Sequence, residues 1–344
     1  MSNTLYALGI GVGTQNADGE WLEVFFPQPL LQPEPELQAL LERIGYTGGN
    51  CDLPLSPQQM PELAAELKAA GQDALAQSVA ALGDSVRPLV ATVLAVDSAP
   101  ETVPETYLKL QLLSHRLVKP HQTDLSGAFA VLRNVAWTSE GAIELAELPA
   151  RQLQARLENR ELEVSCVDKF PKMSNYVVPA GVRIAHTARV RLGAYLGEGT
   201  TIMHEGFVNF NAGTEGPGMI EGRISSGIMI GSGSDLGGGS STMGTLSGGG
   251  NIVNTMGSGC LLGANAGVGI PLGDRCTVEA GLYITAGTKV CMLDAQGRAV
   301  ETLKARELAG KSDLLFRRNS VTGTVECLTN RSAIELNEEL HAHN

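Results

Sequence analysis

A six-residue spacing of aliphatic side chains runs through the middle third of this 344-residue chain. A period of six fits neither an amphipathic helix, which repeats about every 3.6 residues, nor a strand of a hairpin sheet, which alternates every second residue. It is typical of a parallel β-helix, in which three hexads close one triangular coil and the aliphatic side chains point inward. The spaced residues are Val178, Ile184, Val190, Leu196, Ile202 and Val208, then Ile224, Ile230 and Leu236, then Met256, Leu262 and Val268, and finally Leu272, Val278, Ile284 and Val290.

Glycine supports this interpretation, because 27 of the 41 glycines fall between Gly181 and Gly287. The turns of each coil need small residues and positive φ angles, which glycine supplies. Residues 178–290 predict about six coils, or about 29 Å of solenoid at a strand spacing of about 4.8 Å. Two stretches, 215–223 and 237–251, interrupt the pattern and are predicted to form loops on one face, where solenoids often bind ligands. The period does not give the handedness, since ordinary parallel crossovers are right-handed in about 98% of cases.

The regions on either side of the repeat predict two further domains. Residues 1–170 predict a mixed α/β domain, and residues 293–344 predict a small cap on the open end of the β-helix at 171–292. GIGVG (9–13) lacks the full spacing of a nucleotide-binding loop and is interpreted as part of a strand. The elements expected in the first domain are strands at 5–12, 21–27 and 86–97, helices across 35–84 and at 106–118, and a strand–turn–strand unit at 134–145. Those expected in the cap are a hairpin, a short helix and a strand.

Composition and charge exclude several classes of protein. The formal net charge of −12 disfavours nucleic-acid binding, which needs a basic surface. The sequence contains no run of 18 apolar residues, so no membrane span is predicted. The first residues do not resemble a secretory signal. The six cysteines include no CxxC pair, so reduced thiols and a cytoplasmic location are expected.

Polar side chains gather at one place in this apolar, glycine-rich region. The segment MHEGFVNFNAGT (203–214) contains His204, Glu205, Asn209 and Asn211. Asparagine is also common in turns, so a structural role for both asparagines remains open. His186 lies 18 residues before His204, which predicts that the two imidazoles stack on successive coils.

Four segments together resemble the tetrahydrodipicolinate N-succinyltransferases of the longer-chain type, a branch of the hexapeptide-repeat acyltransferases. They are MHEGFVNFNAGT (203–214), GANAGVGIPLGD (263–274), VEAGLYITAGTKV (278–290) and LLFRRNSVTG (314–323). The resemblance is strong from residue 167 to 344 and loose over the first 150 residues. It implies a left-handed β-helix that assembles as a homotrimer, with active sites between neighbouring copies. A Mg²⁺ ion on the trimer axis is a further possibility, and no tightly bound cofactor is implied.

The resemblance also implies a reaction in lysine and diaminopimelate biosynthesis. Succinyl-CoA donates its succinyl group to the amine of ring-opened tetrahydrodipicolinate, giving N-succinyl-2-amino-6-oxopimelate and CoA. Glu205 matches the catalytic glutamate of such enzymes. It could attack the thioester to form an anhydride, or accept the proton of the attacking amine, and the sequence does not separate these roles. His204 is a rival base, and a purely structural ion pair of Glu205 with an arginine across the trimer is the third hypothesis.

The same resemblance assigns contacts with succinyl-CoA along the solenoid and in the cap. Basic residues concentrate at 303–318, which suits the phosphates of CoA in an otherwise acidic chain, although a solvated cap face would have the same composition. Glycine in the solenoid would let the pantetheine arm approach the backbone. The expected contact residues are Phe207, Gly222, Ser225, Gly248, Gly263, Ala264, Lys304, Arg317, Arg318, Asn319 and Ser320.

Three other functions fit the repeat. The first is an acetyl-CoA-dependent hexapeptide acyltransferase acting on another amine or a sugar. The second is a solenoid scaffold without enzymatic activity. The third is a γ-class carbonic anhydrase, which collects three histidines around a metal, but only His186 and His204 occur between 178 and 290.

Overall fold

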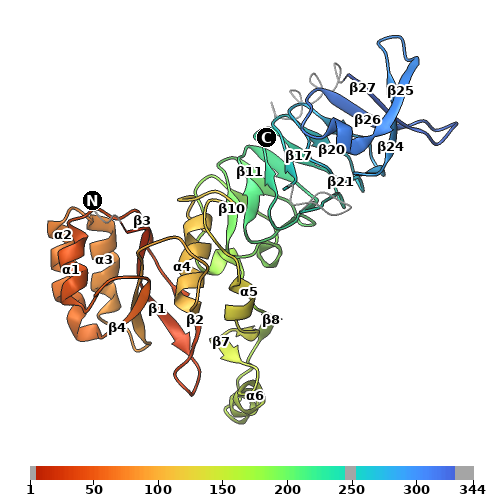
Figure 1. The fold of residues 1–344 in the computed structure, drawn as a ribbon. Coiled ribbons are helices and arrows are strands. Elements are labelled where there is room, and N and C mark those ends of the chain that lie inside the picture. Colours follow the sequence, from red (N-terminus) through yellow and green to blue (C-terminus); the bar gives the residue numbers. More distant parts are fainter. Residues whose placement is uncertain (1–4, 245–252, 330–344) are drawn as a thin grey trace. The chain divides into compact units, whose positions relative to one another are not determined.

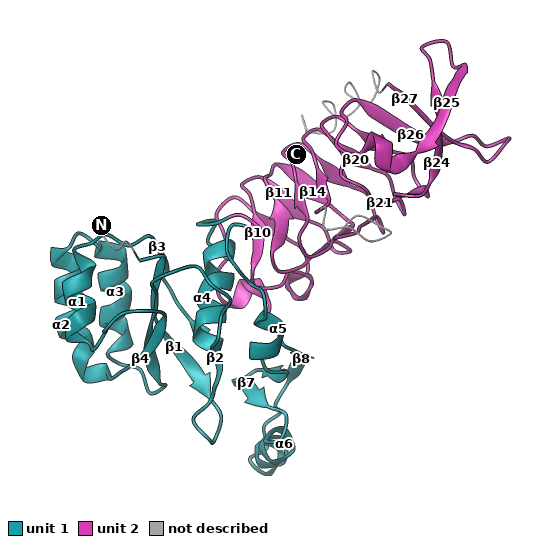
Figure 2. Ribbon diagram, viewed as in Figure 1, with its two compact units in different colours: residues 1–118, 122–171 teal, residues 119–121, 172–344 magenta. Residues whose placement is uncertain are grey.

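The computed structural model describes residues 5–244 and 253–329. The chain divides into two compact units, drawn in different colours in Figure 2: residues 1–118 with 122–171, and residues 119–121 with 172–344. Figure 1 labels some of the helices and strands of each unit. Within the described ranges no helix is both long enough and apolar enough to cross a membrane.

The first unit is built on a five-stranded sheet with strand order β2-β1-β5-β4, to which β3 is added beside β1. Leucine, valine and isoleucine side chains of this sheet pack against three helices in one large apolar cluster. The strands are β1 (Ala7–Gln15), β2 (Trp21–Phe25), β3 (Leu30–Leu31), β4 (Cys51–Leu55) and β5 (Leu89–Leu94). The helices are α1 (Leu37–Arg43), α2 (Met60–Ala69), α3 (Asp73–Leu82) and α4 (Val103–Ser114).

Most elements expected in this unit are present, and the prediction that GIGVG lies in a strand is confirmed by β1. The prediction that residues 35–84 are entirely helical is wrong, because β4 lies between α1 and α2. β4 pairs antiparallel with β5 along its whole length, from Cys51 opposite Val93 to Leu55 opposite Leu89. A smaller sheet, β7 (Gly141–Glu144), β6 (Val135–Thr138) and β8 (Val164–Asp168), follows with α5 (Ala128–Val131) and α6 (Leu148–Leu157).

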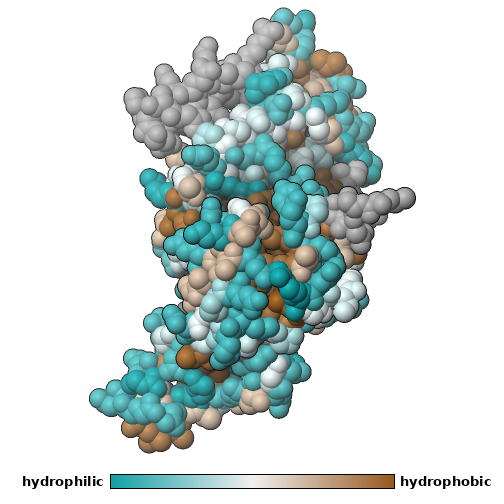
Figure 3. Space-filling view, turned by 90° about the vertical axis from the view of Figure 1, so that its left-hand side faces the viewer, coloured by the Kyte–Doolittle hydropathy of each residue, from teal (hydrophilic) through white to brown (hydrophobic). Residues whose placement is uncertain are grey.

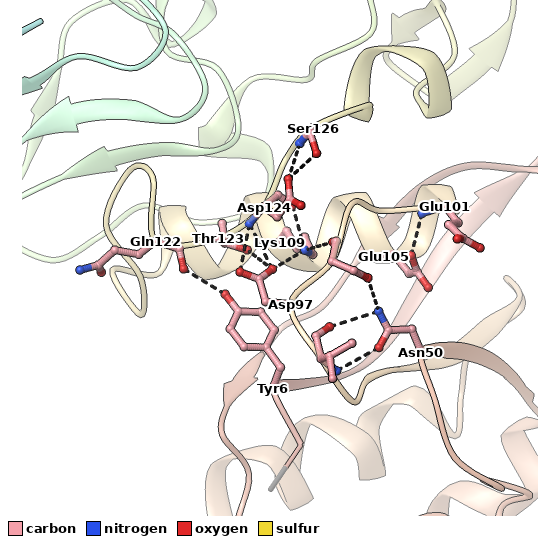
Figure 4. Close-up of polar contacts among 12 residues, drawn as sticks. Tyr6, Asn50, Asp97, Glu101, Glu105, Lys109, Gln122, Thr123, Asp124 and Ser126 are labelled. Carbon is pink, nitrogen blue, oxygen red and sulfur yellow. Dashed lines mark hydrogen bonds and ion pairs between the residues drawn. The ribbon is translucent and has the colours of Figure 1, made fainter. Parts of the chain in front are cut away.

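A fully buried lysine joins the end of the first sheet to the chain that follows α4 (Figure 4). The ammonium of Lys109 donates hydrogen bonds to the Asp97 carboxylate, to the Ser98 carbonyl and, at 2.8 Å, to the Asp124 carbonyl. The Asp97 carboxylate also accepts from the Thr123 hydroxyl and the Asp124 amide. Burying a charge is unfavourable unless it is paired and hydrogen-bonded, so this set of contacts holds residues 123–124 in one place.

The second unit is a parallel β-helix made of three sheets. One sheet contains β9 (Arg183–Ile184), β11 (Thr200–Ile202), β14 (Gly218–Ile220), β17 (Asp235–Leu236), β20 (Leu261–Leu262) and β22 (Thr277–Val278). The second contains β12 (Phe207–Val208), β15 (Arg223–Ile224), β18 (Ser241–Thr242), β21 (Gly267–Gly269) and β23 (Tyr283–Thr285). The third contains β10 (Ala194–Leu196), β13 (Ala212–Thr214), β16 (Met229–Ile230) and β19 (Thr255–Met256). Strands of successive coils pair in parallel, so the coil predicted from the hexads is confirmed.

The predicted inward positions hold with three corrections. Val178 is 60% exposed and lies before β9, so the hexad run begins at Ile184 instead. Residues 215–223 are not an interruption, because β14 pairs with β11 and β17 inside the solenoid. Thr214 and Ile220, both 0% exposed, fill the two inward positions between Val208 and Ile224 that the sequence analysis left empty. The second predicted interruption, 237–251, contains β18 and extends into residues outside the described ranges.

The end of the chain returns to the solenoid. β24 (Lys289–Leu293) and β25 (Ala299–Lys304) form a hairpin, and a 3₁₀ turn (Ala305–Leu308) follows. β26 (Leu314–Arg318) then pairs in parallel with β22, the last solenoid strand of its sheet, and antiparallel with β27 (Val325–Thr329). The edge that the last coil would otherwise expose is therefore covered by the chain itself.

Apolar and polar side chains are distributed between core and surface as expected for such a coil. The inward aliphatic residues of the solenoid are buried, and Figure 3 shows a face on which hydrophilic side chains predominate, with hydrophobic ones confined to smaller areas between them. The six cysteines are free thiols, as predicted. Burial raises the pKa of Cys327 to about 12, which keeps this thiol protonated and unreactive.

Candidate functional site

One corner of the triangular coil collects most of the predicted site residues. We call it the glycine corner: the turns that connect the β11 sheet to the β12 sheet, at 203–206, 221–222, 237–240, 263–266 and 279–282, together with residues 317–319 at the end of β26. Backbone hydrogen bonds stack these turns directly on one another. Met203 N donates to Ile220 O and Glu279 N donates to Phe316 O, at the two ends of the series.

Glycine is required in this corner by the close stacking of the turns. A Cβ atom on Gly237 would lie 2.7 Å from the amide nitrogen of Ala264, and one on Gly263 would lie 2.6 Å from that of Ala280. Neither residue has a positive φ angle, so the constraint is the space between coils and not the backbone conformation. At these two positions no side chain covers the backbone of the corner.

One turn of the corner is two residues shorter than the others. Ile202 pairs with Ile220, eighteen positions further on, whereas Ile220 pairs with Leu236, only sixteen positions further on. The missing length lies between Ile220 and Ile224, where two residues, Glu221 and Gly222, make the whole turn. This short turn recedes between the longer turns on either side of it.

A hollow of about 520 Å³ opens at the short turn. It brings together Glu205, Phe207 and Gly222, three of the residues predicted from the sequence. Residues that the sequence analysis missed also line it, namely Arg189, Glu221, Arg223, Gly238, Gly239 and Ser240. The coil length could have revealed one of these, because Arg223 lies one full coil of eighteen positions after Glu205, whereas Arg189 and Glu221 lie sixteen positions before and after it.

Glu205 presents its carboxylate to solvent at this hollow, with the side chain 68% exposed. The Arg189 guanidinium donates to the backbone carbonyls of Glu205, at 2.7 Å, and Gly206, at 3.2 Å, and one of its nitrogens lies 3.8 Å from the Glu205 carboxylate. The Nδ1 atom of His204 lies 3.1 Å from the same carboxylate. The carboxylate is thus held between a cation and an imidazole while one side stays open to a ligand.

The two histidine rings lie against each other on successive coils, as their spacing in the sequence predicted. The rings of His186 and His204 pack edge to face, with 5.3 Å between their centroids. Among the described residues no group of three or more histidine, cysteine, aspartate or glutamate side chains is arranged to hold a metal ion. The two asparagines of 203–214 have structural contacts: Asn209 accepts a hydrogen bond from Arg191, and Asn211 has a φ of 50° and accepts one from the His121 amide.

The predicted CoA contacts divide into two groups. Gly263 and Ala264 lie in the glycine corner, and Arg317 and Arg318 lie at its end. Five coil steps separate Ile202, three residues before Glu205, from Phe316, next to Arg317, which corresponds to about 24 Å. Asn319 and Arg317 both contact the Glu326 carboxylate, so their side chains are partly engaged, and Ser320 is exposed.

The second group lies away from the glycine corner. Ser225 sits at the other end of the two-residue strand β15, where its hydroxyl donates to the Thr242 carbonyl. Lys304 ends β25, which is separated from Arg317 on β26 by β24 and β27 in the order of the sheet. Gly248 lies outside the described residues.

Replacing Gly222 with alanine is expected to lower the free energy of unfolding by about 1–3 kcal/mol, because the added methyl group would overpack the short turn. Its Cβ would lie 2.1 Å from the Ser240 hydroxyl and 2.7 Å from the Ser240 carbonyl oxygen. Denaturant unfolding measures the effect, with Gly287→Ala as the control for stability, since a Cβ at Gly287 has no heavy atom within 4 Å. Equal stability of the two variants would mean that the short turn is not tightly packed.

Comparisons with known proteins give a consistent family. A family model described as "Tetrahydrodipicolinate N-succinyltransferase middle" matches residues 132–172, and one described as "Hexapeptide repeat of succinyl-transferase" matches residues 253–286. Proteins named 2,3,4,5-tetrahydropyridine-2,6-dicarboxylate N-succinyltransferase are similar over their full length. The protein from Pseudomonas putida is 66% identical, with 100% of both chains covered, and that from Vibrio cholerae is 60% identical, with 98% of this chain and 99% of its own covered.

A solved structure extends the likeness to the fold. The crystal structure of a putative 2,3,4,5-tetrahydropyridine-2-carboxylate N-succinyltransferase from Campylobacter jejuni matches with a TM-score of 0.87 at 33% identity. The match covers 96% of this chain and 94% of that chain, so it includes both compact units.

Proposed function

Because the chain belongs to the tetrahydrodipicolinate N-succinyltransferase family, we propose that the hollow beside Glu205 is its active site. The chain is an N-succinyltransferase: it transfers the succinyl group of succinyl-CoA to the amine of tetrahydrodipicolinate, a step in lysine and diaminopimelate biosynthesis. The observation that supports the location is the exposed Glu205 carboxylate at the mouth of a hollow floored by glycine.

Glu205 is the catalytic residue of this proposal and acts as the nucleophile. One carboxylate oxygen attacks the thioester carbonyl carbon, the carbon–sulfur bond breaks, and CoA leaves as a thiolate that takes up a proton. The acceptor amine then attacks the succinyl carbonyl of the resulting anhydride, which returns the Glu205 carboxylate and releases a proton. In the other role, Glu205 would only accept the proton of the amine while the amine attacks the thioester directly. Arg189 and His204 hold the carboxylate in both cases.

Succinyl-CoA, in this proposal, lies along the glycine corner with its thioester at Glu205. Gly222, Gly263 and Ala264 leave the backbone accessible to the pantetheine arm. The phosphates reach the end of the corner, where Arg317, Arg318, Asn319 and Ser320 present cationic and polar groups. Phe207 lines the hollow, whereas Ser225 and Lys304 lie outside the glycine corner and do not line the hollow. Lys304 and Ser225 are therefore assigned to cofactor bound against a neighbouring copy.

A homotrimer, as the family resemblance implies, is part of this proposal, with the open hollow of each copy closed by a neighbouring copy. The solenoid is inferred to be left-handed, as in the hexapeptide-repeat succinyltransferases that it resembles. The division at residues 170 and 292 into an α/β domain, the β-helix and a cap stays a prediction. We assign the enzyme to the cytoplasm, with succinyl-CoA as co-substrate, no tightly bound cofactor, and neither nucleic acid nor membrane as a partner.

A Mg²⁺ ion at the trimer axis is retained as a proposal. Since one chain offers no ready-made set of three acidic or histidine ligands among its described residues, such an ion would need the same residue from several copies.

Initial rates of CoA release test the proposed function. With tetrahydrodipicolinate as acceptor we expect kcat/KM for succinyl-CoA to exceed that for acetyl-CoA by at least about 100-fold, as a site that binds a charged group discriminates strongly against a donor lacking it. Sedimentation of the same sample should give the mass of three chains. Equal use of acetyl-CoA would point to a different acyltransferase.

A further inference from the structure

The hollow contains two arginines, and they have different environments. Arg189 is committed to the protein, since its guanidinium donates to the carbonyls of Glu205 and Gly206. Arg223 is exposed, and no hydrogen bond or ion pair joins its guanidinium to an acceptor elsewhere in 5–244 or 253–329. It is the cation of the hollow that remains available to a ligand.

The backbone of Arg223 is nevertheless tightly fixed. Its amide donates to Ser240 O at 2.8 Å, and its carbonyl accepts from the Thr242 hydroxyl at 3.0 Å. The next residue, Ile224, is fully buried in the solenoid and anchors the two-residue strand. The backbone freedom of Arg223 is therefore already lost, so binding a ligand would cost only the rotamer freedom of its side chain.

Register places Arg223 beside the predicted chemistry. In the β12 sheet it pairs with Phe207 on one side and with Ser241 on the other, so it lies one coil step, about 4.8 Å, from the strand that follows Glu205. Its guanidinium can therefore reach a group attached to a substrate atom reacting at Glu205.

The charges that line the hollow indicate which substrate group Arg223 can bind. Both substrates of the proposed function carry carboxylates: the succinyl group has one at its free end, and the acceptor has two. Any of them placed here would face Glu205 and Glu221, which repel it, and would need a cation to compensate. A guanidinium suits a carboxylate because its planar fork can donate two parallel hydrogen bonds.

Resting on the proposed function, we propose that Arg223 binds a substrate carboxylate in the hollow and thereby positions the substrate against Glu205. The carboxylate comes either from the succinyl group or from the acceptor. In the first case Arg223 selects succinyl-CoA over donors that lack the carboxylate. In the second it orients the amine for attack.

The test compares wild type with Arg223→Gln and Arg223→Lys. The first variant removes the charge, and the second keeps the charge but not the fork. Kinetics are measured while each substrate is varied in turn, and the affinities of succinyl-CoA and CoA are measured by calorimetry. Arg298→Gln is the control, because the Arg298 side chain is 75% exposed in the β24–β25 turn and contacts Asp294 and Gln296 within that turn.

We expect Arg223→Gln to lower kcat/KM by about 10- to 100-fold, the usual effect of losing a hydrogen bond to a charged group, and Arg223→Lys to lower it less. If the succinyl carboxylate is the ligand, wild type binds succinyl-CoA more tightly than CoA, and the variant loses that difference. If the acceptor carboxylate is the ligand, KM for the acceptor rises and the affinity difference stays.

Values of KM and kcat/KM within twofold of wild type for both substrates would overturn the proposal, as would a loss of kcat alone with both KM values and the affinities unchanged. Failure of the proposed function is recognised separately, because it would abolish transfer in wild type and in the Arg298→Gln control. The calorimetric comparison of succinyl-CoA with CoA still tests Arg223 in that event.

Discussion

Glu205→Gln is expected to lower kcat by about a thousandfold, within the range of 10²–10⁴ that a proton-transferring group contributes. The amide has nearly the shape of the carboxylate, so the hollow and its contact with Arg189 should survive. It cannot attack a thioester, however, and it cannot accept a proton from an amine near neutral pH. The release of CoA thiol measures the rate, and binding of succinyl-CoA should stay close to that of wild type.

A single-turnover experiment without acceptor separates the two roles of Glu205. A nucleophile releases one equivalent of CoA per site and leaves a succinyl group on the enzyme that hydroxylamine removes, whereas a base releases none. Glu301→Gln serves as the control, since Glu301 lies exposed on β25. Wild-type rates in Glu205→Gln would exclude both roles.

Lys109→Met should destabilise the first unit by about 3 kcal/mol, because it leaves the partners of a fully buried ammonium without their donor. Among the described residues, the Asp97 carboxylate then keeps the hydrogen bonds of the Thr123 hydroxyl and the Asp124 amide (Figure 4). For a unit of this size the change corresponds to a fall in Tm of about 6–12 °C. Calorimetry of the whole protein measures it.

Lys68→Met is the matched control, since Lys68 is exposed in the last turn of α2. We expect its Tm to stay within about 1–2 °C of wild type, which is the ordinary range for surface substitutions. Adding Asp97→Asn to Lys109→Met should recover part of the loss, because the uncompensated carboxylate is then removed. Similar Tm values for Lys109→Met and Lys68→Met would show that the buried pair contributes little.

The sequence predicts the solenoid well because its signal is repeated in every coil. The prediction fails where a coil departs from the six-residue spacing of aliphatic side chains. Thr214 was overlooked because it is polar, yet its hydroxyl is satisfied inside the solenoid by the Gly216 amide. Ile220 was overlooked because the next inward residue follows after four positions instead of six, at the short turn that forms the hollow.

The first unit shows a different failure. β4 was absorbed into a helical region because its five residues include Pro54 and follow a cluster of glycines. Proline is tolerated there because β4 is an edge strand, with β5 as its partner in the sheet. Edge position depends on pairing with residues 89–93, some forty positions away, which no local pattern contains.

The residues of the candidate site likewise divide into those that the sequence reveals and those that only the fold brings together. The motif around Glu205 was recognisable because its residues are adjacent in sequence. Arg189 and Arg223 come from neighbouring coils, and their approach depends on the length of each coil. A search at the eighteen-residue interval of one coil would have found Arg223, whereas Arg189 and Glu221 lie sixteen positions from Glu205 and fall off that interval.

The strand β26 completes the last coil of its sheet with a segment from beyond the repeat. Because of its position, the number of coils sets the distance between two parts of the site. The Glu205 carboxylate lies at one end of this distance, and the arginine pair at 317 and 318 lies at the other. Adding or removing a whole coil would keep the hydrophobic interior and the chemistry of the remaining turns. It would nevertheless change the distance between the Glu205 carboxylate and the arginine pair by about 4.8 Å. Selection for a cofactor of fixed length would therefore act on the count of coils, while the individual side chains within them could vary.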